Sequence, residues 1–125
     1  MLRSELAARS GLRRRFVSAS TLDHRYAAYH DAWRRVVERT VSRNYPAEAK
    51  EKKLAGSLVL HVAIRSDGSA TETRIVRSSG YQALDKAALY VIRMAEPFAP
   101  FSDAIRKETD MIDIASVWHF RLGDE

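Results

Sequence analysis

The stretch SLVLHVAIRSDGSATETRIVR, residues 57–77, decides the fold of this chain. Apolar residues recur at every second position from Leu58 to Ile64, which is typical of a strand with one buried face. Asp67-Gly68 follows and predicts a hairpin turn, because glycine accepts a positive φ without steric cost. The return strand, from about Ser69 to Arg77, alternates less regularly, and its adjacent Ile75 and Val76 predict a β-bulge.

A helix and a last strand complete the expected domain. An apolar stripe at helical spacing runs from Leu84 to Ala95 and predicts a helix that packs on the sheet. Residues 96–110 form a longer connection, in which Phe98 and Phe101 are expected to anchor in the core. The last strand runs from Met111 to about Leu122. The predicted fold class is therefore α+β, with a three-stranded antiparallel sheet packed against one helix in the order ββαβ.

Two helices are expected before the hairpin. Tyr26, Tyr29, Trp33 and Val37 share one face of an amphipathic helix over residues 22–44, which ends before Pro46. A short second helix is predicted over Ala47–Leu54. The chain thus divides into a flexible basic lead-in (1–21), the amphipathic helix (22–44) and a domain over residues 45–125.

The charge distribution argues against a nucleic-acid-binding domain. The 125 residues carry a net charge of +5, but residues 1–21 hold five arginines and one acid, so the rest of the chain carries only +1. A duplex-binding domain usually has a basic face on its folded part. The chain has no cysteine, so it has no disulfide scaffold, thiolate nucleophile or cysteine zinc site.

No group of residues predicts catalysis or a cofactor. Ser78-Ser79-Gly80 lacks the spacing of a hydrolase elbow, and the glycines are not spaced as a phosphate loop. His61 and His119 fall on the outer face of the predicted sheet, where a third metal ligand is missing, and we expect them to be solvated. The sequence therefore predicts a non-enzyme with no metal and no cofactor.

The order of several short motifs resembles the C-terminal domain of the TonB energy transducers. The resemblance covers about Ser42 to Leu122 and is specific through the order of its parts rather than through any one of them. Its parts are Tyr45-Pro46, Ala47, Ala49, Gly56, the strand Leu58–Ile64, Asp67-Gly68, Ser78-Ser79-Gly80, Leu84-Asp85, Ala87-Ala88, Pro97-Phe98 with Pro100, and Trp118-His119-Phe120.

The resemblance implies a periplasmic domain of a protein anchored in the bacterial inner membrane. Such a transducer takes energy from the proton-motive-force motor ExbB–ExbD and grips the TonB box of an outer-membrane receptor. It thereby drives the import of siderophores, haem or cobalamin. The box adds as a strand to the last strand of the domain, and a last strand at the sheet edge offers the unpaired backbone groups that this needs.

The resemblance also implies a set of partner-binding residues. On the last strand, these are residues expected to line the outer face, and they are accompanied by residues just before the Tyr-Pro motif. The predicted partner-binding residues are Met111, Asp113, Ala115, Val117, His119, Arg121, Ser42, Arg43 and Asn44.

Three alternatives stay open at this point. A TolA-like or other cell-envelope scaffold domain could bind a protein partner with the same architecture and without energy transduction. A small basic nucleic-acid-binding domain would use the arginine-rich lead-in. The first helix, with its large aromatic stripe, could cover the edge strand or mediate a homodimer.

Overall fold

Residues 56–77 form the hairpin that the sequence predicts. The computed structural model describes residues 11–43, 47 and 51–120. Within it, β2 (Gly56–Arg65) and β3 (Ala70–Arg77) pair antiparallel, and Gly68 at the turn has φ +92°, a value that favours glycine. Leu60 pairs with Ile75 whereas Val59 pairs with Arg77, so the residue between, Val76, is the bulge that the pattern predicts.

The sheet has four strands rather than the three predicted. Its order is β1-β4-β2-β3, with β4 (Met111–Phe120) antiparallel to β2 along its whole length. The additional strand, β1 (Arg14–Val17), pairs in parallel with Met111–Ile114. This strand lies in the segment that was predicted to be a flexible lead-in, so that prediction is wrong for these residues.

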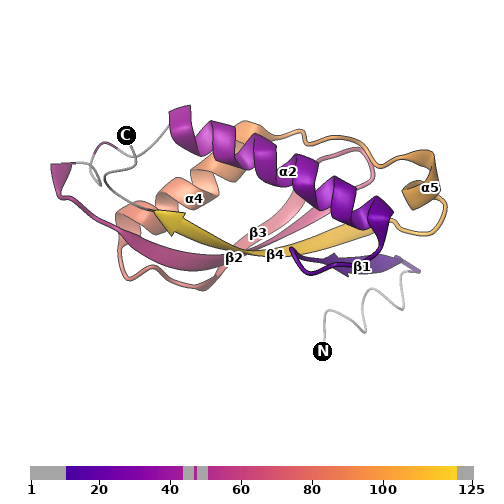
Figure 1. Ribbon diagram of the computed structural model, residues 1–125, viewed down its shortest axis with the longest axis horizontal. Coiled ribbons are helices and arrows are strands. Elements are labelled where there is room, and N and C mark those ends of the chain that lie inside the picture. The colour runs from indigo at the N-terminus through magenta and orange to yellow at the C-terminus, as the bar shows by residue number, and fades with distance from the viewer. Residues whose placement is uncertain (1–10, 44–46, 48–50, 121–125) are drawn as a thin grey trace.

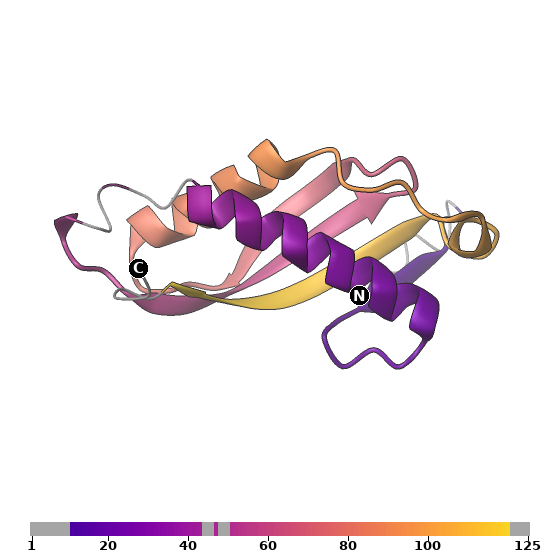
Figure 2. The same cartoon turned by 45° about the horizontal axis from the view of Figure 1, so that its top comes forward.

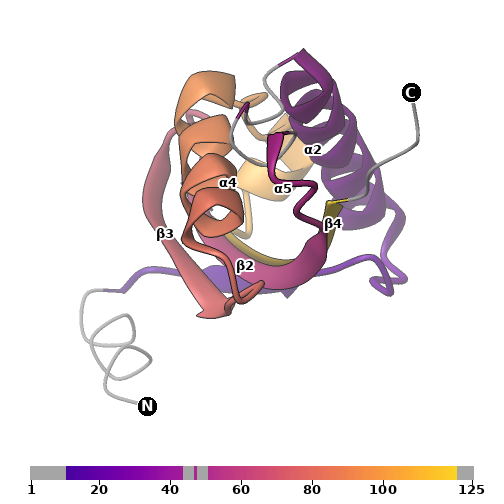
Figure 3. The ribbon, with the colours of Figure 1, turned by 90° about the vertical axis from the view of Figure 1, so that its left-hand side faces the viewer.

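Both long helices lie on one face of the sheet. Figures 1 and 3 show α2 (His24–Arg43) above the β4 side of the sheet and α4 (Gln82–Ala95) above β2 and β3. Figure 2 shows α2 lying along β4, with its N-terminal turn at the end of the sheet where α5 lies. The opposite face, called the outer face below, is covered by neither helix.

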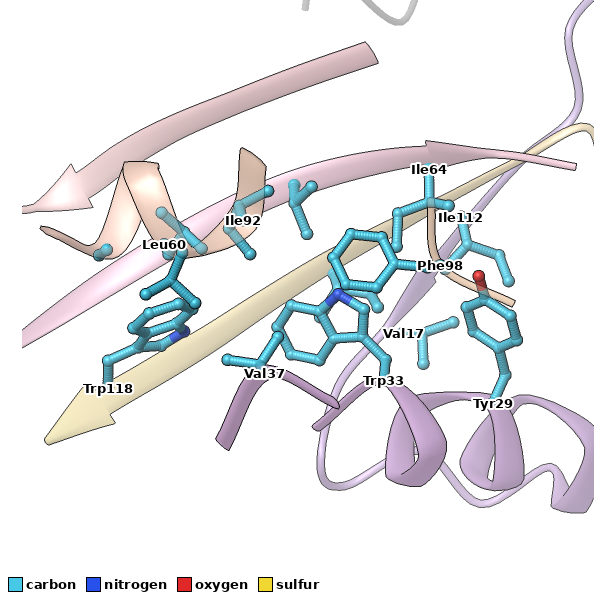
Figure 4. Packing of buried hydrophobic residues seen from close by; sticks show 14 of the residues in the cluster. Val17, Tyr29, Trp33, Val37, Leu60, Ile64, Ile92, Phe98, Ile112 and Trp118 are labelled. Atoms are coloured by element: carbon cyan, nitrogen blue, oxygen red, sulfur yellow. The ribbon is translucent and has the colours of Figure 1, made fainter. Parts of the chain in front are cut away.

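The core lies between the helices and the sheet (Figure 4). Trp33 and Val37 of α2 point toward the strands, and the Trp33 ring lies beside Phe98, with 6.2 Å between the ring centroids. Phe98 and Phe101 are both buried, which confirms that the connection after α4 is anchored in the core. The aromatic stripe of α2 is therefore a packing face of this domain.

The connection after α4 also contains a helix that the sequence analysis missed. α5 (Asp103–Arg106) is a single turn capped by Ser102, whose hydroxyl accepts a hydrogen bond from Ile105 N–H. Of the short helix predicted over Ala47–Leu54, residues 48–50 lie outside the described residues; Ala47 and Glu51 are helical, and the chain has turned out of the helix at Lys53, whose φ is 54°. In the part of the chain that is described, no helix is long and apolar enough to cross a membrane.

Candidate functional site: the two halves of the last strand

β4 has one covered half and one open half. Met111 N–H donates to the Arg13 carbonyl at 3.1 Å, so the backbone groups of Met111 point toward β1. Alternate residues of a strand direct their backbone groups to the same side, so those of Asp113, Ala115, Val117 and His119 point the same way. β1 ends opposite Ile114, and among the described residues no strand pairs with this edge over Ala115–Phe120. We call Ala115–Phe120 the open edge.

A groove of about 770 Å³ runs between the open edge and α2. Its apolar floor includes Trp33 and Val37 from the helix and Trp118 from the strand, while Arg34 and Glu38 lie along its rim. The turn that leaves β1 closes part of its border. The groove is lined by Ser18, Ala19, Ser20, His30, Trp33, Arg34, Val37, Glu38, Val41, Ser42 and all six residues of the open edge.

The covered half of β4 is held by a buried ion pair on the outer face. Arg14 donates two hydrogen bonds to the Asp113 carboxylate, Nε to Oδ2 at 2.9 Å and Nη2 to Oδ1 at 2.5 Å. His61 Nε2 lies 2.9 Å from the same Oδ1. Asp113 is only 1% exposed and Arg14 15% exposed, so the charge of each stabilises the other away from solvent. The hydrogen bond to Asp113 raises the pKa of Arg14, which therefore stays protonated.

The rest of β1 is anchored on both sides of this pair. The backbone N–H and the guanidinium of Arg13 bond to the Asp110 carboxylate, and this holds the pKa of Asp110 below its ordinary value. The guanidinium of Arg15 lies 4.4 Å from the centre of the Tyr26 ring, within range of a cation–π contact. Val17 is 2% exposed in the core, whereas Phe16 points away and is 73% exposed.

The structure divides the predicted partner-binding residues into groups. Met111 and Asp113 lie beside β1, while Ala115, Val117 and His119 lie on the open edge. Val117 is 58% exposed, and His119 Nδ1 lies 2.8 Å from the Ser57 hydroxyl. Ser42 lines the groove and Arg43 ends α2; Asn44 and Arg121 lie outside the described residues.

One expectation about the outer face is wrong. His61 was predicted to be solvated, but it is buried and bonded to Asp113, which lies on the expected outer face and is itself buried there. Arg14 provides the cation that makes this burial favourable, and it comes from a strand that the sequence analysis missed. Within the described ranges, no group of histidine, cysteine or acidic residues could hold a metal ion.

The groove side of α2 was also missed as part of the site. From the sequence, Trp33 and Val37 were placed on one face of an amphipathic helix that could cover the edge strand, but a groove between this face and the edge was not predicted. Their spacing of four residues carries the signal, since it places both on the side of the helix that faces the sheet.

Comparisons with known proteins agree with this geometry. Residues 41–122 match the family described as Gram-negative bacterial TonB protein C-terminal. The Protein TonB of Haemophilus influenzae is 36% identical over 69 residues, which cover 55% of this chain and 25% of that protein. The Protein TonB of Pasteurella multocida is 30% identical over 84 residues, which cover 67% of this chain and 32% of that protein. The chain thus spans about a quarter to a third of the length of these relatives.

A solved structure shares the fold. The solution structure of the Helicobacter pylori TonB C-terminal domain superposes with a TM-score of 0.58, at 22% sequence identity. The match covers 78% of this chain and 92% of that one. The region that matches the family begins near the end of α2, so β1 and most of α2 precede it.

Proposed function

This chain belongs to the TonB C-terminal family, and on that premise we propose that it is the periplasmic C-terminal domain of a TonB-like energy transducer. In this proposal it binds the TonB box of an outer-membrane receptor by β-strand addition. The observation that carries the proposal is the open edge of β4, where the backbone groups of Val117 and His119 point away from β2 and lie beyond the end of β1.

Strand addition suits a partner that serves several receptors. Main-chain hydrogen bonds are nearly indifferent to the sequence of the added strand, and side-chain pockets supply the selectivity. Each such bond contributes a net free energy of about 1 kcal/mol before the cost of ordering the peptide. The short open edge therefore favours a modest affinity, which fits a contact that must form and release repeatedly.

The remaining parts of the proposal concern the whole transducer. The ExbB–ExbD motor would act on an inner-membrane anchor in the full-length protein and couple the proton motive force to import of siderophores, haem or cobalamin. Family membership supports this assignment. No catalytic step is proposed for the chain.

The test is an NMR titration of the isotopically labelled chain with peptides copied from the TonB boxes of receptors in the same genome. The expected result is that amide shifts concentrate on Ala115–Phe120 and on the groove side of α2. Shifts spread over α4 and β3 instead, or no shift at millimolar peptide, would contradict the proposal.

A proline variant makes this test specific for strand addition. The N–H of Val117 points to the open edge, so Val117→Pro removes an edge donor without removing a hydrogen bond to β2. We expect this variant to fold and to lose peptide binding. Val117→Thr is the matched control, since it keeps the N–H and the β-branched shape, and it should bind like the unchanged chain.

A further inference from the structure

The edge of β4 already carries one added strand, and that strand belongs to this chain. β1 pairs in parallel with Met111–Ile114 and stops where the open edge begins. Its side chains alternate as those of a bound peptide would. Arg15 and Val17 face the helices, while Arg14 and Phe16 face outward.

The contacts of β1 argue that it stays in place. If it left the sheet, the carboxylate of Asp113 would lose Arg14, its cation, and removing one partner of a buried ion pair is strongly destabilising. The core would also lose Val17, which is almost fully buried. A peptide of a few residues cannot offset both losses with backbone hydrogen bonds of about 1 kcal/mol each.

The chain turns away from the sheet directly after β1. Ser18 N–H donates to the Thr21 hydroxyl at 2.9 Å, and Thr21 N–H donates to the Ser18 carbonyl at 3.1 Å. This closed turn carries the chain up to α2, and Ser18 to Ser20 border the groove. β1, the turn and α2 therefore frame the open edge from the end and from one side (Figures 1 and 2).

We propose that a partner strand binds only along Ala115–Phe120, end to end with β1 and without displacing it, and that its groove-facing side chains are apolar. This inference rests on the proposed function and deepens it, since it defines the length and the side-chain pattern of the bound segment. The occupant is an extended segment of another protein, and its place continues the pairing that β1 makes with the same edge.

The apolar pattern follows from the lining of the groove. Val17 of β1 is buried against the helices, so one side of a strand added to this edge faces the core. On a partner strand paired with Ala115–Phe120, the side chains on that same side would meet Trp118 of β4 and Trp33 and Val37 of α2. Burying one aliphatic side chain there contributes about 1.5–3 kcal/mol. Arg34 and Glu38, which also line the groove, are paired with each other across one turn of α2.

A reversible disulfide that holds β1 in the sheet distinguishes binding beside β1 from binding that displaces β1. Val17 and Ile114 are register partners on neighbouring strands, and neighbouring strands lie about 4.8 Å apart, within the range that a disulfide bridges. The chain has no cysteine, so Val17→Cys with Ile114→Cys introduces one bridge only. The probe is the TonB-box peptide of the titration above, and the reduced variant is the control.

The expected result is that the oxidised and reduced forms bind the peptide within about twofold of each other, a difference of less than half a kcal/mol. Binding lost on oxidation and restored by reductant would overturn the inference, because β1 would then have to leave. Absence of binding by the unchanged chain would overturn the proposed function instead, and the inference with it.

A second pair of variants tests the groove and does not depend on the disulfide. Glu38 lines the groove and Arg39, the next residue, does not. Glu38→Trp should fill the groove and weaken peptide binding by about tenfold, whereas Arg39→Trp should change it by less than about twofold. Equal effects of the two variants would overturn the role of the groove.

Discussion

The two halves of β4 have the same alternating pattern and differ in what lies beside them. In Met111–Ile114 both faces are buried, because β1 pairs with the edge and Arg14 covers Asp113. In Ala115–Phe120 the edge is open and Val117 is largely exposed. The availability of an edge strand therefore depends on a segment far away in the sequence, since Arg13 bonds to Asp110 across 97 positions.

The ion pair of the covered half gives the largest expected effect. Asp113→Ala leaves Arg14 as a partly buried cation and removes the hydrogen-bond partner of His61, so it should lower the free energy of unfolding by about 3 kcal/mol or more. His119→Ala, on the open half, should change it by less than about 0.5 kcal/mol. Urea denaturation of both variants measures the difference, and similar losses in the two would remove the distinction between the halves.

Two neighbouring residues of β1 also differ in burial, since Val17 lies in the core and Phe16 is exposed. Val17→Ala removes two methyl groups from the core and should cost about 2 kcal/mol, counting about 0.8 kcal/mol per group and a further amount for the cavity. Phe16→Ala, next to it but exposed, should stay within about 0.5 kcal/mol. If the two variants unfolded at the same urea concentration, β1 would not be anchored through the core.

The local part of the fold was predictable from the sequence. The hairpin, its bulge at Val76, the helix over Gln82–Ala95 and the last strand follow from periods of two and 3.6 residues and from the Asp67-Gly68 turn. These signals depend on neighbours in the sequence. The outward or inward side of each strand residue could be assigned in the same way.

The pairing of β1 could not be predicted by such signals. Arg14–Val17 has only four residues, two of them arginines, and its partner strand lies almost a hundred positions away. Because β1 was missed, the prediction gave Asp113 no cation, and its burial beside Arg14 was not foreseen. The sequence predicted that the candidate site is an edge of the last strand. It did not predict that β1 covers one half of this edge.

Acid between pH 5 and pH 3 should weaken the covered half. The hydrogen bonds from Arg13 lower the pKa of Asp110, so this pair stabilises the fold above the unfolded value of about 3.9 and loses its contribution as the pH falls through the lower folded value. The pair is partly exposed, so its contribution is below about 1 kcal/mol. Unfolding at pH 5 and pH 3 measures it, and Asp110→Asn should lose less stability over this range than the unchanged chain. An identical loss in both would assign the acid sensitivity to other carboxylates.

The smallest effect is expected beside the open half, at His30 in the groove. Burial lowers the pKa of His30, the positive charge of Arg34 lowers it further, and Asp31 acts in the opposite direction. The unfolded chain takes up a proton near pH 6.5 while the folded chain does not, so stability should fall slightly between pH 7.5 and 5.5. His30→Gln should remove this part of the pH dependence, as measured by thermal unfolding at both pH values. A stability that rises toward pH 5.5 in the unchanged chain but not in His30→Gln would mean that the groove favours the imidazolium. The groove would then suit an acidic segment better than the apolar one that its lining favours.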